Sequence, residues 1–537
     1  MPKTMTKKAA PAPRTIWMIA REYEGLAGAG GVKDVVRQLS EALARAGHRV
    51  SVVLPLYGFM DPQALGFASL GLAFEVAMDY EAKERRELVR VFARSDAGGR
   101  LTIYLLDAQR YLEKKGVYTY TAEEEARNPF HAQGSGHYDY FAMNILLQKG
   151  ALALMLRQGA KPDVIHCHDG HAATLAAMLR EIEGYRHSFC ETPAVVTVHN
   201  AGIGYHQEVA DLPFAAAITG LPRRVIDDNL LDGAFDPLLA AATYAPLNAV
   251  SENYARELRE TDADALTGWL GHRLLARGVE LGGITNGINP ADFNPENPKA
   301  LGLPAAFSPQ KRDLAGKRTC REELVKRLRQ RDFAALRQTG ELSDDLDQPL
   351  FTLIGRLTTQ KGVDKLLGAM ETLLPLDQNF QVVILGSGSR DIEGALAALA
   401  GQERHRGRVC VLQGYEARAA NLIYASGDFF LVPSQYEPCG LTDFIAQLFG
   451  NLPVVHHVGG LVKVKDGVTG FAYQEHKSAA LMGAMQKALR LFRKSPEKIL
   501  DMQQAAVQHI YEHYTWDAVL HQYLALYDKA RTTLPAP

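Results

Sequence analysis

The fold is decided by the stretch Phe429-Phe430-Leu431-Val432-Pro433-Ser434-Gln435-Tyr436-Glu437-Pro438-Cys439-Gly440-Leu441-Thr442. An apolar run of β type ends, a carboxylate and a glycine follow, and a helical pattern begins. A helix that opens just past a strand presents unpaired backbone N–H groups, which favour an anion. With Glu437 beside them, the stretch predicts phosphate binding next to a group that can hold a sugar hydroxyl. This layout is expected of a nucleotide-sugar site.

Apolar β-type runs alternate with helical patterns along the whole chain, which predicts parallel sheets flanked by helices. In the first half the runs are Thr15–Ala20, His48–Leu54, Leu101–Leu106, Asp163–His168, Ala194–His199 and Leu247–Val250. In the second half they are Leu350–Gly355, Gln381–Leu385, Val409–Leu412, Phe429–Val432 and Leu452–His456. Glycine, asparagine and proline gather between the two sets and mark a linker. We therefore predict an α/β protein with two doubly wound domains joined near residues 285–309.

Length and composition fit a protein of several globular domains. The 537 residues predict about two to four domains, and a net charge of −2 gives no push toward nucleic acid or a membrane surface. No apolar run is long enough to span a bilayer, and residues 1–13 are expected to form a disordered tail. The five cysteines form no C-x-x-C pair, so we expect a reducing cytoplasm and no disulfide framework.

Polar side chains gather just past four of the predicted strands. Those runs deliver His168 and Asp169, then His199 and Asn200, then Arg356 and Lys361, and finally Ser434 and Glu437. Ligands of open α/β sheets bind beyond the carboxyl ends of the strands, so four such groups split between two domains predict a site in a central cleft. The arginine fork and the lysine point charge, five residues apart, suit a pyrophosphate.

The segment His166-Cys167-His168-Asp169-Gly170-His171 has a spacing close to that of metallo-hydrolase clusters. On a strand, His166 and His168 share one face, whereas Asp169 and His171 belong to the turn and the helix start. We therefore predict no catalytic metal and favour Asp169 as a polar contact to the substrate.

Three other patterns are weaker. The loop Gly25–Gly31 is only loosely a dinucleotide fingerprint, because Lys33 stands where a further glycine is needed, and a dehydrogenase is disfavoured. Two D-x-D matches, Asp262–Asp264 and Asp345–Asp347, lie in polar or helical stretches and are taken as chance. The stretch Lys311–Arg331 is strongly basic, and a solvated helix is favoured over a site for an anionic ligand.

With these residues assembled, the chain resembles the bacterial glycogen synthases and plant starch synthases, retaining glucosyltransferases of the two-domain GT-B fold. The resemblance runs from about Thr15 to about Tyr527. Its motifs are Gly30–Val36, His166–His171, Thr197–Asn200, Val250–Ala255, Gly283–Ile288, Arg356–Gly362, Glu437–Thr442, Gly459–Leu461 and Thr469–Phe471. The resemblance implies an acceptor-side domain of starch synthase catalytic type over residues 14–290. It further implies a nucleotide-sugar domain over 291–515 and a helix crossing back over 516–537.

The resemblance also implies a division of roles. The catalytic residues would be His199, Asp169, Arg356, Lys361 and Glu437. The donor-binding residues would be Gly30, Gly31, Arg356, Lys361, Ser434, Glu437, Cys439, Gly440, Leu441, Thr442, Gly459 and Gly460. The implied reaction moves glucose from a nucleotide-glucose, with ADP-glucose favoured over UDP-glucose, to the non-reducing end of an α-1,4-glucan. Neither a metal nor another cofactor is implied, and nucleic acid and membranes are not expected partners.

The chain departs from the family pattern at several positions. Gly28 stands in place of a lysine, Gly170 in place of a tryptophan, Asp443 in place of a glutamine, and Val458 and Lys463 in place of a threonine and an aspartate. One hypothesis is that Lys463 restores the positive charge lost at Gly28. The changes at Gly28 and Asp443 keep one alternative open, a GT-B transferase with an altered donor or a small acceptor. A second alternative is a catalytically weak glucan-binding homologue, and the retained candidate catalytic residues argue against it.

Overall fold

The computed structural model describes residues 12–534, and the chain divides into two compact units. Unit 1 comprises the chain up to Val250, the segment Ala255–Ile284 and the residues from Leu520 onward. Unit 2 comprises Ser251–Tyr254 and Thr285–Val519. Residues 1–11 of the predicted disordered tail lie outside the described residues.

Unit 1 is built on a nine-stranded sheet whose strand order is β11-β10-β7-β6-β1-β2-β5-β4-β3. The strands are β1 (Thr15–Ile19), β2 (Arg49–Pro55), β3 (Ala68–Ala77), β4 (Arg86–Ser95), β5 (Leu101–Asp107), β6 (Val164–His168), β7 (Ala194–Val198), β10 (Leu247–Ala249) and β11 (Gly282–Gly283). All pairs from β5 to β11 are parallel, and β4 and β3 add an antiparallel hairpin at one edge. The strand order reverses between β1 and β6, the arrangement that places a ligand crevice beyond these strand ends in doubly wound sheets.

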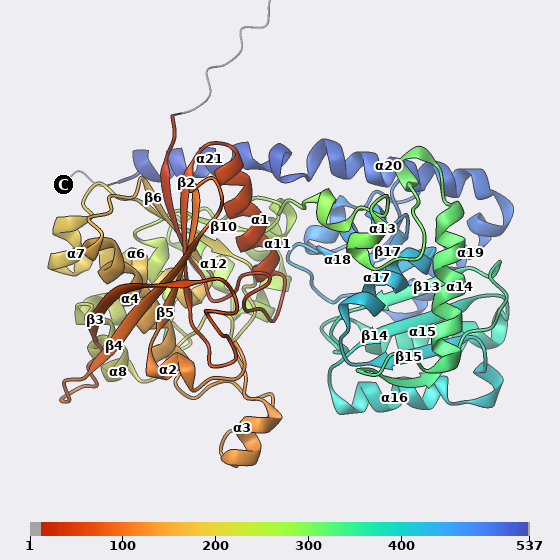
Figure 1. Cartoon of the computed structure of the whole chain (residues 1–537), viewed down its shortest axis with the longest axis horizontal. Helices are drawn as coiled ribbons and strands as arrows, with labels where there is room; N and C mark the ends of the chain where they lie inside the picture. Colours follow the sequence, from red (N-terminus) through yellow and green to blue (C-terminus); the bar gives the residue numbers. More distant parts are fainter. Residues whose placement is uncertain (1–11, 535–537) are drawn as a thin grey trace, which may run out of the picture. The chain divides into compact units, whose positions relative to one another are not determined.

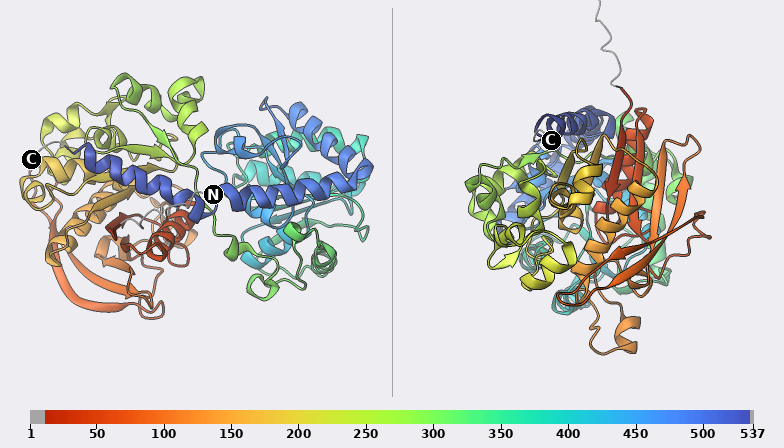
Figure 2. Two further views of the ribbon diagram at one scale, coloured as in Figure 1. Left: turned by 90° about the horizontal axis from the view of Figure 1, so that it is seen from above. Right: turned by 90° about the vertical axis from the view of Figure 1, so that its left-hand side faces the viewer.

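The parallel strands of unit 1 are buried because helices cover both faces. Every residue of β6 and β7 is buried, and the apolar helix α4 (Tyr140–Arg157) contributes a largely buried surface. Helix α1 (Val32–Arg45) follows β1 and buries one amphipathic face. The short helix α3 (Ala122–Arg127) instead projects from the body of unit 1, as two views show (Figure 1 and Figure 2).

Unit 2 repeats the same plan in a seven-stranded sheet with the order β12-β15-β14-β13-β16-β17-β18. Its strands are β12 (Arg337–Gly340), β13 (Leu350–Ile354), β14 (Gln381–Gly386), β15 (Val409–Gln413), β16 (Phe429–Val432), β17 (Leu452–His456) and β18 (Phe471–Tyr473). Only β12 pairs antiparallel. The reversal of strand order lies between β13 and β16, so the opening stretch of the sequence follows a strand at this point.

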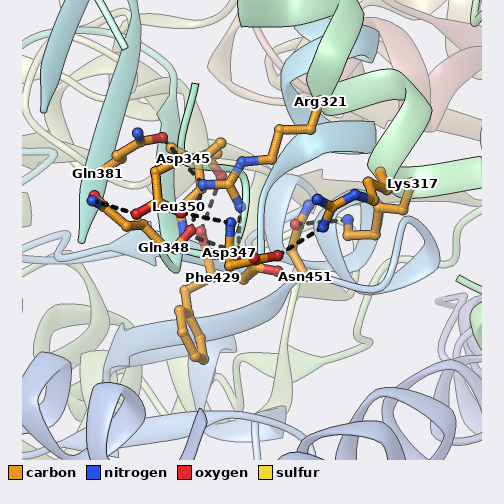
Figure 3. A network of polar contacts seen from close by, with 12 residues as sticks. Lys317, Arg321, Asp345, Asp347, Gln348, Leu350, Gln381, Phe429 and Asn451 are labelled. Carbon is orange, nitrogen blue, oxygen red and sulfur yellow. Dashed lines mark hydrogen bonds and ion pairs between the residues drawn. The ribbon is translucent and has the colours of Figure 1, made fainter. Parts of the chain in front are cut away.

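The basic segment of unit 2 is less solvated than predicted. Helix α14 (Ala315–Gln330) buries Lys317 and Arg321. The Lys317 ammonium donates to the carbonyl oxygens of Tyr424 and Phe449 at 3.3 and 2.9 Å, and burial lowers its pKa to about 8. The Arg321 guanidinium pairs with Asp428 at 3.1 Å. Figure 3 shows these two side chains reaching from α14 into a polar network, in which Lys317 donates to Asn451 and Arg321 donates to Gln381. They anchor the helix and do not form a ligand site.

The C-terminal helices complete the chain. Helix α20 (Pro496–His513) packs on the short helix α18 (Thr442–Leu448) within unit 2. Helix α21 (Trp516–Thr532) has residues up to Val519 grouped with unit 2 and residues from Leu520 grouped with unit 1. Within residues 12–534, no helix is long and apolar enough to cross a bilayer.

Candidate functional site

In unit 1, one carboxylate ties together the ends of two neighbouring strands. Asp169 follows β6 directly, and its Oδ1 accepts the backbone N–H of His199 at 2.6 Å and of Asn200 at 3.4 Å. Asp169 has a φ of 57°, which is uncommon for a residue other than glycine, and such backbone strain clusters at functional sites. Burial raises the pKa of Asp169 to about 7, in spite of the two N–H donors. The structure therefore brings the predicted pair Asp169 and His199 together.

Gly170 has a steric reason to be glycine here. A Cβ atom at this position would lie 2.0 Å from the backbone oxygen of His206. His206 is itself fixed, because its Nδ1 lies 2.7 Å from Asp236 and its Nε2 lies 2.6 Å from the carbonyl oxygen of Ala201. A tryptophan, the residue of the family pattern, does not fit this backbone.

The glycine loop after β1 folds around Glu22, a residue that the sequence analysis missed. The buried Glu22 carboxylate accepts the N–H groups of Ala29 and Gly30 at 2.6 and 3.0 Å, and the Tyr118 hydroxyl at 2.5 Å. Gly30 and Gly31 are exposed. Because the Gly30 amide already has a partner, a ligand would meet this loop through other atoms.

Lys33 lies across Gly28, where the family pattern has a lysine. A Cβ atom at Gly28 would lie 2.2 Å from Cδ of Lys33. The Lys33 ammonium pairs with the carboxylates of Glu24 and Asp34. Its positive charge is therefore balanced locally by two acids of the same loop and helix start.

In unit 2, three predicted residues form one cluster beyond β16 and β13. The Lys361 ammonium lies 2.5 Å from Oε2 of Glu437, and the Ser434 hydroxyl donates to the same oxygen at 2.9 Å. Burial alone would raise the pKa of Glu437, but Lys361 and Ser434 outweigh it and hold the pKa below its usual value. Arg356 is exposed and donates to Gln360 Oε1 at 3.0 Å. Glu437 is thus an ionised acceptor between a serine and a lysine, with a solvent-facing guanidinium on the neighbouring strand end.

The turn after Glu437 is locked against the turn after β17 by two glycines. A Cβ at Gly459 would lie 2.1 Å from the carbonyl oxygen of Glu437, and a Cβ at Gly460 would lie 2.2 Å from that of Cys439. The Gly460 N–H donates to the Glu437 carbonyl at 2.9 Å. Gly459 and Gly460 therefore shape the turn through close backbone approach. Burial raises the pKa of the Cys439 thiol to about 11, so it stays protonated at neutral pH.

Lys463 also holds this turn, and its contacts argue against the hypothesis that it restores the positive charge lost at Gly28. Its ammonium donates to the carbonyl oxygens of Cys439 at 2.5 Å, Gly440 at 2.8 Å and Gly460 at 3.1 Å, and it pairs with Asp443 at 3.1 Å. The Lys463 side chain is only 4% exposed and that of Asp443 is fully buried. Its charge offsets the acid of the neighbouring helix start instead of replacing the lysine absent at Gly28.

The carbonyl contacts of Lys463 set the direction of the neighbouring amides. Within a planar trans peptide, the N–H points opposite to the carbonyl. Because the Cys439 and Gly440 carbonyls face Lys463, the N–H groups of Gly440 and Leu441 face away from it. In residues 12–534 these two N–H groups, and that of Thr442, donate to no other atom. They remain available to an anion beside Glu437.

Two clusters thus carry the predicted residues, one in each unit. The unit 1 cluster holds a buried acid of raised pKa beside a buried histidine, and the unit 2 cluster holds cations, free amides and an ionised carboxylate. Each flanks the point at which its own sheet reverses strand order, where ligands of doubly wound sheets bind. Among the described residues, no group of three or more His, Cys, Asp or Glu side chains is arranged to hold a metal ion.

Comparison with known proteins identifies the family to which this two-unit chain belongs. Residues 15–272 match the family model of the starch synthase catalytic domain, and residues 337–506 match that of the group 1 glycosyl transferases. Together with the two doubly wound sheets, these matches define a two-domain glycosyltransferase of the GT-B fold. The glycogen synthase of Photobacterium profundum is 30% identical, over 96% of this chain and 94% of that protein. The chain belongs to the glycogen and starch synthase family of glycosyltransferases.

Two further relatives agree with this assignment. The glycogen synthase of Syntrophotalea carbinolica is 31% identical, over 96% of this chain and 98% of that protein. Among solved structures, the catalytic domain of starch synthase IV from Arabidopsis thaliana, bound to ADP and acarbose, has a TM-score of 0.79 at 25% identity. That match covers 97% of this chain and 100% of the solved chain. The family and the fold are therefore the same along nearly the whole length.

Proposed function

We propose that this enzyme transfers glucose from a nucleotide-glucose, preferably ADP-glucose, to the non-reducing end of an α-1,4-glucan with retention of configuration. The observation that carries the proposal is the unit 2 cluster: Lys361 pairs with the ionised Glu437, Arg356 is exposed at the neighbouring strand end, and the N–H groups of Gly440, Leu441 and Thr442 have no acceptor among the described residues. The preference for ADP is supported by the solved starch synthase IV, whose structure contains ADP and acarbose.

The groups of unit 2 suit a diphosphate leaving group. As the bond between the anomeric carbon and the phosphate oxygen breaks, negative charge grows on the diphosphate. Arg356, Lys361 and the N–H groups of Gly440 and Leu441 stabilise that charge without rearranging, which lowers the barrier directly. Glu437 stays ionised through its pairing with Lys361 and accepts hydrogen bonds from glucose hydroxyls.

Asp169 and His199 of unit 1 complete the chemistry in this proposal. The acceptor hydroxyl attacks the anomeric carbon from the face that the diphosphate leaves, and its proton passes to a phosphate oxygen. Asp169 orders the backbone of His199 and Asn200 beside the reacting glucose. A site that excludes water from this step limits hydrolysis of the donor. Retention follows because the new bond forms on the same face as the bond that breaks.

One experiment tests the proposal. The purified protein is incubated with ADP-glucose or UDP-glucose, each with and without glycogen, and nucleotide release is measured. We expect release that depends on glycogen and is faster with ADP-glucose. The new linkage is then checked by the anomeric proton signal and by digestion with an α-1,4-specific amylase.

The same experiment separates the alternatives. Glycogen-independent release to a small sugar acceptor would favour a transferase with an altered acceptor, an alternative kept open by the glycine at position 28. Donor binding without turnover under any condition would favour a glucan-binding homologue. Faster release from UDP-glucose would overturn the donor preference while leaving the reaction type in place.

A further inference from the structure

A row of three buried histidines runs along the ends of β6 and β7, and the proposed reaction uses only one of them. The rings of His166 and His168 stack with centroids 4.3 Å apart, and those of His168 and His199 lie 5.2 Å apart. All three rings are buried. The Nδ1 atom of His168 lies 2.9 Å from the Nε2 atom of His199. The hydrogen-bond partners of the three rings fix the position of each proton in this row.

His166 is fully occupied by its own chain of hydrogen bonds. The Asn248 amide donates to the carbonyl oxygen of Ala249, so its oxygen faces Thr197 and accepts that hydroxyl at 2.9 Å. Because the Thr197 hydroxyl already donates its one proton to Asn248, its oxygen must accept a hydrogen bond from Nε2 of His166, 2.7 Å away. The other nitrogen of His166 then accepts the Tyr527 hydroxyl at 3.0 Å. His166 is therefore neutral and protonated on Nε2.

The contact between His168 and His199 holds one proton, because both rings are neutral. Burial lowers the pKa of His199 to about 3 and that of His168 well below its usual value. The Nε2 atom of His168 is buried and has no hydrogen-bond partner in the described residues. Among buried backbone groups, N–H donors without a partner are rarer than acceptors without one. We apply the same preference to this imidazole, so Nε2 is the bare nitrogen and Nδ1 carries the proton. His168 thus donates to Nε2 of His199.

It follows that His199 carries its own proton on Nδ1. In residues 12–534 the ring makes no other hydrogen bond, since its contact with His168 uses Nε2. The backbone N–H of His199 is meanwhile held by Asp169 at 2.6 Å. The backbone of His199 is therefore held by Asp169 and its ring by His168, and the Nδ1–H group of the ring remains available as a donor.

We propose that His168 is a positioning residue that locks His199 as a neutral hydrogen-bond donor through Nδ1. His199 then donates to an oxygen of the reacting sugar or its diphosphate and takes no proton during the transfer. What His199 meets rests on the proposed function, whereas the tautomer and its dependence on His168 do not. The logic is that of a buried partner that holds a catalytic imidazole in one tautomer.

The tautomer is tested without any substrate. Protein labelled with ¹⁵N-histidine is studied by long-range ¹H–¹⁵N correlation at neutral pH, and His199→Asn and His168→Asn identify the two spin systems. We expect His168 and His199 both to show the Nδ1–H pattern, and His166 to show the Nε2–H pattern. An Nε2–H pattern for His199 would overturn the proposal.

A matched pair of variants tests the positioning role. Asparagine places its amide N–H close to the position of Nδ1 of histidine, whereas leucine fills the space without a donor. In His168→Leu we expect His199 to lose its single tautomer and kcat to fall about tenfold or more, with little change in KM for the donor. His168→Asn should restore most of both. Equal losses of kcat in the two variants, or an unchanged His199 spectrum in His168→Leu, would show that His168 only fills space. Should no turnover be found at all, the spectrum alone decides.

Discussion

Asp169 shows how one residue can be both strained and titratable. It has a positive φ, is buried, and holds the backbone of His199 through its Oδ1 atom. Its pKa in the folded chain, about 7, is well above the value of an unfolded aspartate. A raised folded pKa means that this group stabilises the fold only while it is protonated. Its contribution is complete below about pH 4 and is lost as the pH rises through about 7.

Asp169→Asn should remove this pH dependence. The amide keeps an oxygen acceptor for the His199 N–H but carries no charge to bury. We expect the variant to gain stability relative to the wild type as the pH rises from 5 to 8, by about 3 kcal/mol, because about two pH units of the shift lie in this range. The difference in thermal midpoint between the two proteins is measured at each pH. Asp228→Asn, at an exposed acid of the same unit, is the control for the loss of one carboxylate. A constant difference across this range would contradict the assignment.

At the scale of elements, the turns after β16 and β17 act as one locked piece. Lys463 joins them by three carbonyl contacts and an ion pair with Asp443, and the two glycines allow the close approach. Truncating one partner of a buried ion pair leaves the other charge uncompensated, and that is more costly than losing both partners.

Lys463→Met should therefore destabilise the protein by about 3 kcal/mol, and adding Asp443→Asn should recover part of that loss. The free energies of unfolding of the single and double variants form a cycle whose coupling term is the measured quantity. Lys487→Met is the control, because its pair with Asp466 is about half exposed and is worth less than about 1 kcal/mol. If Lys463→Met keeps full stability and loses only donor affinity, the lysine is a free cation after all.

The elements that were predictable share a physical property. The eleven predicted β-type runs are strands of the structure, each within one residue of its predicted ends, because buried parallel strands are continuously apolar. The hairpin of β3 and β4 was missed, since it is antiparallel and largely exposed, so that charged residues interrupt its pattern. Burial of Lys317 in α14 depends on carbonyl groups that lie more than 100 residues away in the sequence. The role of Glu22 depends on how a loop folds back on it.

At the scale of the whole molecule, the same strand order occurs twice. In each sheet the strand order reverses once, between β1 and β6 in unit 1 and between β13 and β16 in unit 2. The polar strand ends predicted from the sequence gather at these reversals, and this regularity is why a site could be proposed from a single sequence. The residues that differ from the family pattern were not predictable in the same way. Gly28 and Gly170 are explained only by Lys33 and His206, which lie where a side chain at each glycine would begin. Asp443 is explained only by Lys463, which balances its charge.

The two units should therefore fail in different ways when mutated. Arg356→Ala removes an exposed guanidinium from the cluster assigned to the diphosphate, so ADP affinity should fall about tenfold or more, as expected for a lost charge-assisted hydrogen bond. Asp169→Asn alters only the unit 1 cluster and should leave ADP affinity within about twofold while reducing transfer to glycogen. Calorimetric titration with ADP measures the first quantity, and glycogen-dependent nucleotide release measures the second.

The substitution Arg418→Ala, at an exposed arginine elsewhere in unit 2, controls for a general loss of charge. If Asp169→Asn weakened ADP binding as much as Arg356→Ala, the assignment of the diphosphate to unit 2 would be wrong, because a carboxylate that binds only unit 1 amides has no direct means to hold it.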